Sequence, residues 1–389
     1  MILVQNLRLQ LNGNKTIKLF FFILSFIFSG INLYAVKHVD SAYKIAMILP
    51  FHFNDYNGAN INRSNIMLDY YQGFYTALKY YETKGLKLKL FIYDNEHDTN
   101  ITKEILQKPE LKKMDLIISP ILDEHLHILN HFSSKNQIAV FSPFTAADSL
   151  FPKNPLFFNA APSEKSKAEA FFDYYRKNCN DKKILIFKSD SEKNENFENR
   201  LEELILNKNN VEYRFITEDD ILNADSSFLP NYKEYFLYHK AENAKEVKTL
   251  ISFLDKQNAN IEILADYKPL VLKAIHYSKR NKYNIKIISS DYINPLDSAE
   301  KMHDFKNFYK TEFSLFPSRY SIIGHDQACL ISEIFLKYKR FRAVDFTGEN
   351  FKFYSTKFLF KKDPHCNQNR SLFILKYNDK LLEEVISSY

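Results

Sequence analysis

The chain has 389 residues, with 53 lysines and arginines against 47 acidic residues and a formal net charge of +6. Three of the basic residues lie among the first 35 positions, which hold no acid, so the remainder is close to neutral and lacks the positive charge typical of a nucleic-acid binder. With 45% hydrophobic and 26% charged residues, the composition excludes a disordered chain and fits a globular protein large enough for two domains.

The N-terminal segment has the order of a secretory signal peptide. Lys15 and Lys18 precede a largely apolar run from Leu19 to Phe28, and a cleavage site is predicted after Ala35. This run is short for a membrane span, which takes about 20 residues. We therefore predict a signal peptide over residues 1–35 and an exported, periplasmic or extracytoplasmic protein. An uncleaved membrane anchor is the alternative.

From residue 43 onward, short apolar runs alternate with longer amphipathic stretches. The first helix is indicated before Gly85 by apolar residues at spacings of three and four: Met67, Tyr71, Phe74, Leu78 and Tyr81. Strands are predicted at 44–49, 86–93, 115–119, 138–142, 183–188, 211–216, 235–238, 260–264, 284–289, 351–360 and 371–377. Further helices are predicted at 123–135, 163–178 with Ser163 as N-cap, 196–206, 242–257, 269–280, 299–311 and 325–339.

Strands separated by helices of this length form βαβ units, and hence parallel sheets covered on both faces. We predict an α/β protein with two doubly wound parallel-sheet lobes and a cleft between them. Residues 43–160 plus 287–345 are assigned to lobe 1, and residues 161–286 plus 346–389 to lobe 2. The three crossovers, near residues 160, 286 and 345, are expected to act as a hinge.

The strand-end loops are the expected ligand site, because ligands of open parallel sheets bind beyond the carboxyl ends of the strands. These loops are 50–56, 94–98, 119–123, 142–147, 189–192, 239–242, 266–267 and 289–291. Their Ser, Thr and Asp side chains and free backbone N–H groups suit a small polar or zwitterionic molecule. Tyr267 and Tyr292, at strand ends, are predicted to line the cleft.

No signature of an enzyme is present. The seven glycines are scattered, and neither a glycine-rich phosphate loop nor a zinc-protease or nucleophile-elbow motif occurs. We predict a protein that is not an enzyme and that needs no cofactor.

Metal and thiol chemistry are also weakly supported. On the helix predicted from Asp123, His127 and His131 share a face while His125 points elsewhere, so a solvated helix face is favoured over a metal site. The three cysteines are too few and too widely spaced for a disulfide framework, and Cys329 is predicted to be a buried core residue.

The segment from Asp115 to Ser163 contains the stretches DLIISPILDEH, IAVFSPFTAADSL and PLFFNAAPS. They are similar to three patterns of the type I periplasmic binding proteins, the branched-chain amino-acid receptor group: a strand ending in Gly-Pro, an S-P-x-A-T strand end and an F-R-x-x-P-S crossing. The later IISSDYINP and FYKTEFSLFPSRYSIIGHDQA resemble that family's Y…P…GYD helix entry, with His325 where Tyr is usual. The resemblance covers nearly all of residues 43–389. It is closest to envelope members that elsewhere carry LysM modules, although no such module is visible here.

The resemblance implies ligand contacts. Ser142, Thr145 and Ala146 fall where the family holds a ligand's α-carboxylate and amine. Asp123 stands where the family has a ligand-binding Ser, and a carboxylate there would repel an amino acid's carboxylate. Asn159 replaces the crossing Arg, and the second lobe's aromatic-glycine loop becomes SDSEKNENF, without glycine. Because of these departures, amino-acid binding is a weaker expectation. The predicted fold does not depend on them.

We predict an exported, non-enzymatic binding protein that closes two lobes over a small polar ligand, such as an amino acid or a peptide. A membrane permease or a peptidoglycan-associated protein is its expected partner. The alternative is an envelope interaction or regulatory protein, similar to activators of cell-wall synthesis, that keeps the fold and has lost the pocket. The predicted ligand contacts are Ser142, Thr145, Ala146, Asp123, Tyr267 and Tyr292.

Overall fold

The computed structural model describes residues 42–55, 61–119, 123–144, 153–188, 195–208, 211–230, 233–241, 243–267, 271–272, 274–293, 301–362, 366–378 and 381–387. The predicted signal peptide lies outside these residues, as do Thr145 and Ala146. Within the described ranges, no helix combines the length and apolar character needed to cross a membrane.

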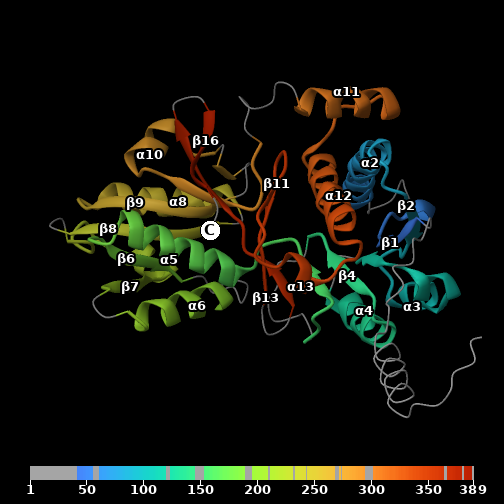
Figure 1. The fold of residues 1–389 in the computed structure, drawn as a ribbon. Coiled ribbons are helices and arrows are strands. Elements are labelled where there is room, and N and C mark those ends of the chain that lie inside the picture. The colour runs from blue at the N-terminus through green and yellow to red at the C-terminus, as the bar shows by residue number, and fades with distance from the viewer. Residues whose placement is uncertain are drawn as a thin grey trace, which may run out of the picture. The chain divides into compact units, whose positions relative to one another are not determined.

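The described chain builds two seven-stranded sheets, A and B (Figure 1). Sheet A contains, in spatial order, β13 (Phe360–Lys362), β14 (Asn367–Asn369), β5 (Phe157–Asn159), β4 (Ala139–Ser142), β3 (Leu116–Ile118), β1 (Tyr43–Leu49) and β2 (Leu88–Asp94). Sheet B contains β16 (Leu381–Ser387), β15 (Phe373–Asn378), β10 (Lys286–Ser289), β9 (Asn260–Tyr267), β8 (Glu234–Ala241), β6 (Lys183–Phe187) and β7 (Tyr213–Ile216). A short hairpin joins β11 (Phe351–Lys352) and β12 (Lys357–Phe358).

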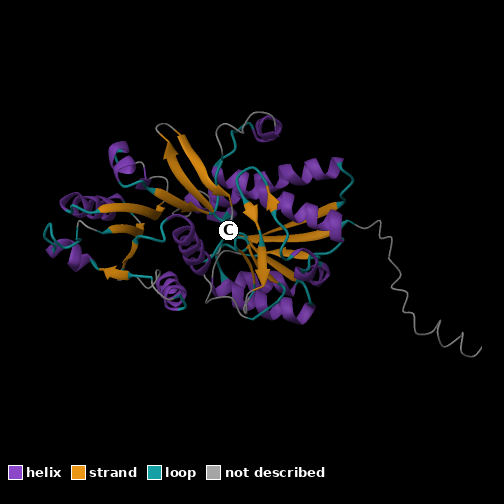
Figure 2. Ribbon diagram, turned by 60° about the vertical axis from the view of Figure 1, so that its left-hand side comes forward, coloured by secondary structure: helices purple, strands orange, loops and turns teal. Residues whose placement is uncertain are grey.

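The first five strands have the same order in both sheets. The first five strands of each sheet run parallel in the order 2-1-3-4-5, which is that of a doubly wound fold. Two more strands extend each sheet on the side of its fifth strand. In sheet A, β14 runs parallel to β5 and β13 antiparallel to β14, whereas in sheet B, β15 runs antiparallel to β10 and β16 antiparallel to β15. The predicted α/β fold with two doubly wound lobes is confirmed, and Figure 2 shows the strands of both sheets with helices against them.

The helices that flank sheet A are α2 (Ile61–Thr83), α3 (Thr99–Gln107), α4 (Asp123–Asn136), α11 (Lys301–Phe313), α12 (Arg319–Tyr338) and α13 (Ala343–Phe346). Those that flank sheet B are α5 (Glu164–Asn178), α6 (Glu195–Leu206), α7 (Glu218–Asn223), α8 (Ala244–Lys256) and α10 (Tyr277–Lys282). Two 3-10 turns lie at Phe53–Asp55 and Pro109–Lys113.

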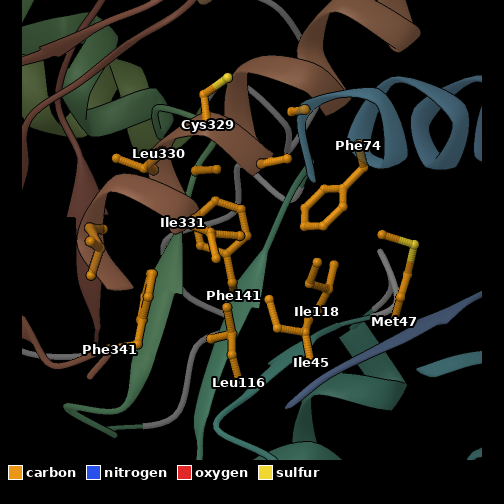
Figure 3. Close-up of a cluster of buried hydrophobic side chains, with 14 of the residues drawn as sticks. Ile45, Met47, Phe74, Leu116, Ile118, Phe141, Cys329, Leu330, Ile331 and Phe341 are labelled. Carbon is orange, nitrogen blue, oxygen red and sulfur yellow. The ribbon is translucent and has the colours of Figure 1, made fainter. Parts of the chain in front are cut away.

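The core of lobe 1 lies on both faces of sheet A. On one face, alternate strand residues such as Ile45 and Met47 pack against Phe74 of α2 and Leu330 of α12 (Figure 3). The other face packs against α3 and α4. Because successive strand residues point to opposite faces, a stretch buried on both sides is apolar throughout, as residues 45–49 of β1 are. In lobe 2, α8 covers one face of sheet B and α5 and α6 cover the other.

Helices α2 and α12 cross at close range. A Cβ atom on Gly73 would lie 1.7 Å from the backbone oxygen of Ser321, and one on Gly324 would lie 2.2 Å from that of Tyr70. No side chain fits at either position, so glycine is required where the two backbones meet. The crossing fixes the first turns of α12 against the middle of α2.

The strand pairing differs from the expected division of the chain. The sequence predicts residues 346–389 in lobe 2. In the structure, however, β13 and β14 pair in sheet A, with β14 parallel to β5. The third crossover therefore lies between β14 and β15, near residue 370, and not near 345. The physical reason is burial: Phe346, Phe358 and Phe360 complete the core beside Phe158. Strand β10 ends at Ser289 in sheet B, so the second crossover follows residue 289.

Several element predictions are confirmed. Helix α5 starts after Ser163, whose hydroxyl accepts the Ser166 N–H as the predicted N-cap. All three cysteines are buried and unbonded to one another. Helix α12 begins six residues earlier than predicted, because a capping box formed by Ser318 and Ser321 closes its N-terminus. The strand predicted over 351–360 is a hairpin plus β13, and α3, which Asp98 caps, was not predicted.

Candidate functional site

A cavity of about 470 Å³ opens at the carboxyl edge of sheet A. Its walls come from the loops after β1, β2, β4 and β5, the first turns of α2 and α12, the segment after β10 and the end of the β11–β12 hairpin. The described lining residues are Pro50, Arg63, Ile66, Met67, His97, Pro143, Phe144, Ala160, Ala161, Ser290, Asp291, Arg319, Tyr320, Ile323, Gln327, Thr356, Phe358 and Asn369. Four of the predicted strand-end loops, 50–56, 94–98, 142–147 and 289–291, contribute to it.

One part of the pocket wall is apolar. Ile66, Met67 and Ile323 face the cavity beside Phe144 and Phe358. The Phe144 ring is held in place by edge contacts, with its centroid 5.0 Å from that of Tyr70 and 6.1 Å from that of Tyr320. A fixed apolar wall of this kind suits the hydrocarbon part of a small ligand.

The charged residues of the pocket have different partners. Arg319 binds Asp291 through two hydrogen bonds, one from Nε to Oδ2 at 2.7 Å and one from Nη2 to Oδ1. This fork geometry cancels the two charges locally. Arg63 instead approaches a ring nitrogen, with its Nη1 3.0 Å from Nδ1 of His97. Among the described lining residues, the formal charge is therefore one positive unit, carried by Arg63.

The surroundings of His97 favour its neutral form. Burial lowers the pKa of His97, and the neighbouring Arg63, His125 and His52 lower it further. Burial also lowers the pKa of His125, whose ring meets that of His97 edge-on at 5.9 Å. Because a guanidinium only donates, Nδ1 of His97 must accept from Arg63, and the ring proton sits on Nε2.

The Asp94 carboxylate holds the two loops that carry His52 and His97. It accepts the backbone N–H groups of Phe51, His52, Phe53 and Glu96. His52, Glu96 and His97 have positive φ angles of 53°, 47° and 63°. Such backbone is uncommon for residues other than glycine, and the bonds to Asp94 hold it in place. The predicted polar loop at 94–98 thus serves to position His97.

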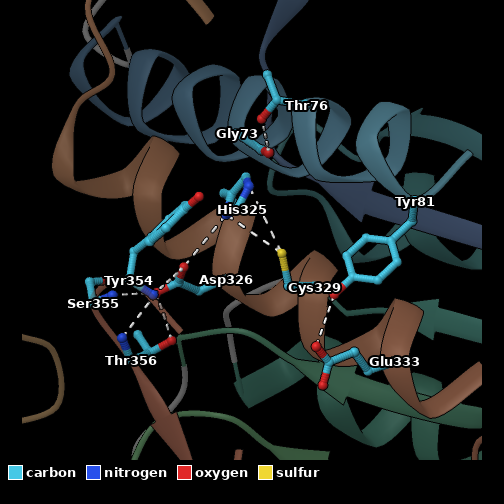
Figure 4. A network of polar contacts seen from close by, with 10 residues as sticks. All are labelled: Gly73, Thr76, Tyr81, His325, Asp326, Cys329, Glu333, Tyr354, Ser355 and Thr356. Carbon is cyan, nitrogen blue, oxygen red and sulfur yellow. Dashed lines mark hydrogen bonds and ion pairs between the residues drawn. The ribbon is translucent and has the colours of Figure 1, made fainter. Parts of the chain in front are cut away.

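Side chains of helix α12 form hydrogen bonds to two further walls of the pocket. Gln327 accepts from the Tyr70 hydroxyl at 2.8 Å and donates to the Pro143 carbonyl at 3.0 Å. Asp326 is fully buried and accepts the N–H and hydroxyl groups of Ser355 and Thr356, as Figure 4 shows beside His325 and Cys329. These bonds tie the strand-end loop and the hairpin to the same helix.

The predicted site residues lie in several places. Ser142 ends β4 and is fully buried, directly before the pocket residues Pro143 and Phe144. Its Oγ has no hydrogen-bond partner among the described residues. Asp123 is the first residue of α4, and its side chain lies outside what the structure describes.

Neither predicted tyrosine is among the described residues that line the pocket. The Tyr267 hydroxyl lies 2.7 Å from Nδ1 of His239 and is buried at the end of β9. Tyr292 is 9% exposed, and its ring lies 6.0 Å from that of Phe373.

Sequence reasoning missed Arg63, His97 and Arg319. His97 lies in the predicted loop 94–98 and Arg319 in the stretch that resembles the family's helix entry, but neither was named as a site residue. Only the fold brings the three side chains together. The predicted solvated face of α4 holds for His127 and His131, which are exposed, but His125 is buried against His97. The described residues contain no group of three or more metal-ligating side chains suited to a metal ion.

The carboxyl edge of sheet B carries a charge network. The Lys167 ammonium binds Asp266 at 2.7 Å and Glu164 at 2.8 Å, and Lys240 lies 3.3 Å from Glu164. Burial alone would lower the pKa of Lys167, but the two carboxylates outweigh it and raise that pKa. Beside the network, burial lowers the pKa of His239 to about 3, so this imidazole is neutral.

Comparison with solved structures places the architecture. A putative branched-chain amino acid ABC transporter protein from Rhodospirillum rubrum superposes with a TM-score of 0.65 at 10% identity, over 89% of this chain and 100% of that one. The chain has the type I periplasmic binding protein fold. A solute binding protein of an ABC transporter from Rhodopseudomonas palustris, in complex with 3,4-dihydroxy benzoic acid, gives 0.54 at 13% identity over 90% and 97%.

Full-length LpoA from Haemophilus influenzae is also similar, with a TM-score of 0.61 at 13% identity, over 89% of this chain and 59% of that chain. A scan against models of known protein families finds no match, and a search of curated proteins finds none. At these identities the likeness establishes the type I binding-protein fold and leaves the ligand open.

Proposed function

We propose that this protein is an exported, non-enzymatic binding protein that closes its two lobes over a small polar ligand. The observation that carries the proposal is the pocket of about 470 Å³ at the carboxyl edge of sheet A. Its volume falls in the usual range of about 300–1,000 Å³ for small-molecule sites, and it combines an apolar wall with a few polar groups. In doubly wound sheets this edge is where ligands bind.

The predicted loop contacts fit this proposal. In the sequence, Ser142 directly precedes the pocket residues Pro143 and Phe144, and Thr145 and Ala146 directly follow them. Closure would bring the edge of sheet B toward the pocket by a hinge motion about the three crossovers, and contacts on both lobes would stabilise the closed state. In this function the partner of the loaded protein would be a membrane permease.

The first test is native mass spectrometry of the purified protein, followed by thermal melts with amino acids, organic acids, amines, peptides and cell-wall fragments. A ligand that binds only the native state raises the melting temperature in a way that saturates with concentration. Thr145→Trp should abolish this shift and leave the fold intact, whereas Thr83→Trp, at an exposed position near the end of α2, should not. An empty protein that no compound stabilises would overturn the proposal.

A second candidate is an envelope interaction protein that works through an outer surface. The similarity in fold to LpoA favours it, as does the edge of sheet B, where the charged side chains bind one another. It predicts no ligand-dependent stabilisation and specific capture of an envelope protein. The pocket at sheet A favours the first candidate.

A further inference from the structure

The polar groups that line the pocket differ in how many hydrogen bonds they already form within the protein. The Gln327 amide bonds Tyr70 and Pro143, and the Thr356 hydroxyl donates to Asp326. The Asn369 amide donates to two carbonyls and accepts two backbone N–H groups. These groups hold the walls together, and a ligand can recruit them only by breaking bonds within the protein.

Arg63 stands apart from this pattern. Within the described residues, its hydrogen bond uses one N–H group, at Nη1, and the acceptor is Nδ1 of the neutral His97 ring. A guanidinium carries five N–H donors and stays charged at all physiological pH values. Arg63 therefore offers the pocket a positive charge that no described carboxylate neutralises, together with a donor fork that matches a carboxylate.

The charges of the lining residues also disfavour a ligand with an ammonium group. Asp291 is the acidic residue among the described lining residues, and both of its oxygens accept from Arg319. An amino acid placed with its carboxylate on Arg63 would bring its ammonium into a pocket whose net charge is already positive. That group would lose its water without gaining a carboxylate partner, which is costly.

We propose that the ligand is a small organic monoanion, a carboxylate on an apolar body without an α-ammonium group, and that Arg63 is its anion-binding residue. The carboxylate lies on the guanidinium, beside His97, and the apolar body lies against Ile66, Met67 and Phe144. This inference rests on the proposed function and narrows its ligand class. Neutral His97 positions Arg63 and adds no charge, so a single unneutralised cation faces a single anionic group.

The test uses matched compounds that differ in one group each: leucine, 4-methylpentanoate and 3-methylbutylamine, and their phenyl counterparts phenylalanine, 3-phenylpropanoate and 2-phenylethylamine. Affinities are measured by calorimetry and thermal shift at low and moderate salt. We expect the carboxylates to bind at least about tenfold tighter than the zwitterions, with the amines weakest, because a charge-assisted bond forms without an unpaired ammonium. Salt should weaken carboxylate binding.

Three variants assign the effect to the residue. Arg63→Gln should weaken carboxylate binding by about tenfold or more and remove most of its salt dependence, and Arg63→Lys should restore part of it. Arg340→Gln makes the same charge change at an exposed arginine that is not among the described lining residues, and it should leave binding unchanged. Melting curves of the ligand-free variants show that each is folded.

The outcomes separate the two proposals. If zwitterions or amines bind as well as carboxylates, or if Arg63→Gln binds carboxylates normally, the anion inference is wrong and the binding function stands. If no compound of any class, in these series or in the wider panel, stabilises the protein, the binding function fails and the anion inference fails with it.

Discussion

The carboxyl edges of the two sheets share one strand order, but their charged groups behave differently. At sheet A, Arg63 meets a neutral histidine and faces a cavity. At sheet B, Lys167 is held between Asp266 and Glu164, and His239 is bonded to Tyr267. The guanidinium at one edge has no carboxylate partner among the described residues, while the ammonium at the other is paired with two carboxylates.

The largest effect is expected from Lys167→Met, which breaks the network at sheet B. The substitution leaves Glu164 and Asp266, 15% and 20% exposed, without their shared cation. We expect a loss of about 3 kcal/mol in the free energy of unfolding, measured by denaturant titration. Lys279→Met, at a surface pair where Lys282 also binds Asp255, should cost less than about 1 kcal/mol. Equal effects would show that the network is not structural.

The next effect concerns the frame of the sheet A pocket. Gly73→Ala places a Cβ against the Ser321 backbone, which cannot move without separating α2 from α12. We expect about 3 kcal/mol of destabilisation and weakened ligand binding, since both helices carry pocket residues. Gly85→Ala has open space and only a positive φ to tolerate, so it should cost about 1–2 kcal/mol and leave binding unchanged.

The pH dependence of stability distinguishes the two edges further. Because burial lowers the pKa of His239 from its ordinary value of 6.5 to about 3 in the folded state, its contribution to stability is fully present above pH 6.5 and is lost as the pH falls toward 3. The expected slope is about 1.4 kcal/mol per pH unit in this window. His239→Gln should remove that slope from unfolding titrations between pH 6 and 4. An unchanged slope would contradict the assignment.

The smallest effect on stability is expected from Asp291→Asn. The Asp291 side chain is 9% exposed, but Arg319 is 47% exposed and can be hydrated when the pair is lost, so stability should change by less than about 1 kcal/mol. The pocket, however, gains a second unneutralised guanidinium, and carboxylate affinity should rise by about threefold or more. Asp345→Asn alters a similar pair outside the described pocket lining and should not change affinity. A lower affinity in Asp291→Asn would refute the electrostatic basis of the anion site.

Much of the fold was predictable because its signals are local. The run KIAMIL and the spacing of Met67, Phe74 and Tyr81 reflect burial on sheet faces, and these patterns depend on strand and helix periods alone. The strands β13 and β14 were assigned to the wrong lobe. Their placement depends on pairing with β5, more than 200 residues earlier in the chain, which no local pattern encodes.

The candidate site was predictable only in outline. Alternating strands and helices determine that the carboxyl-end loops meet at one edge, and four of these loops line the pocket. The tertiary structure decided which side chains reach it: Tyr267 turns to His239, while Arg63 and Arg319 enter from two helix starts that the Gly73–Gly324 crossing brings together. Sequence alone determined the alternation of buried strands and amphipathic helices, since these follow from local periodicity. The balance of charge at each edge arises from contacts between distant residues, which only the packed chain creates.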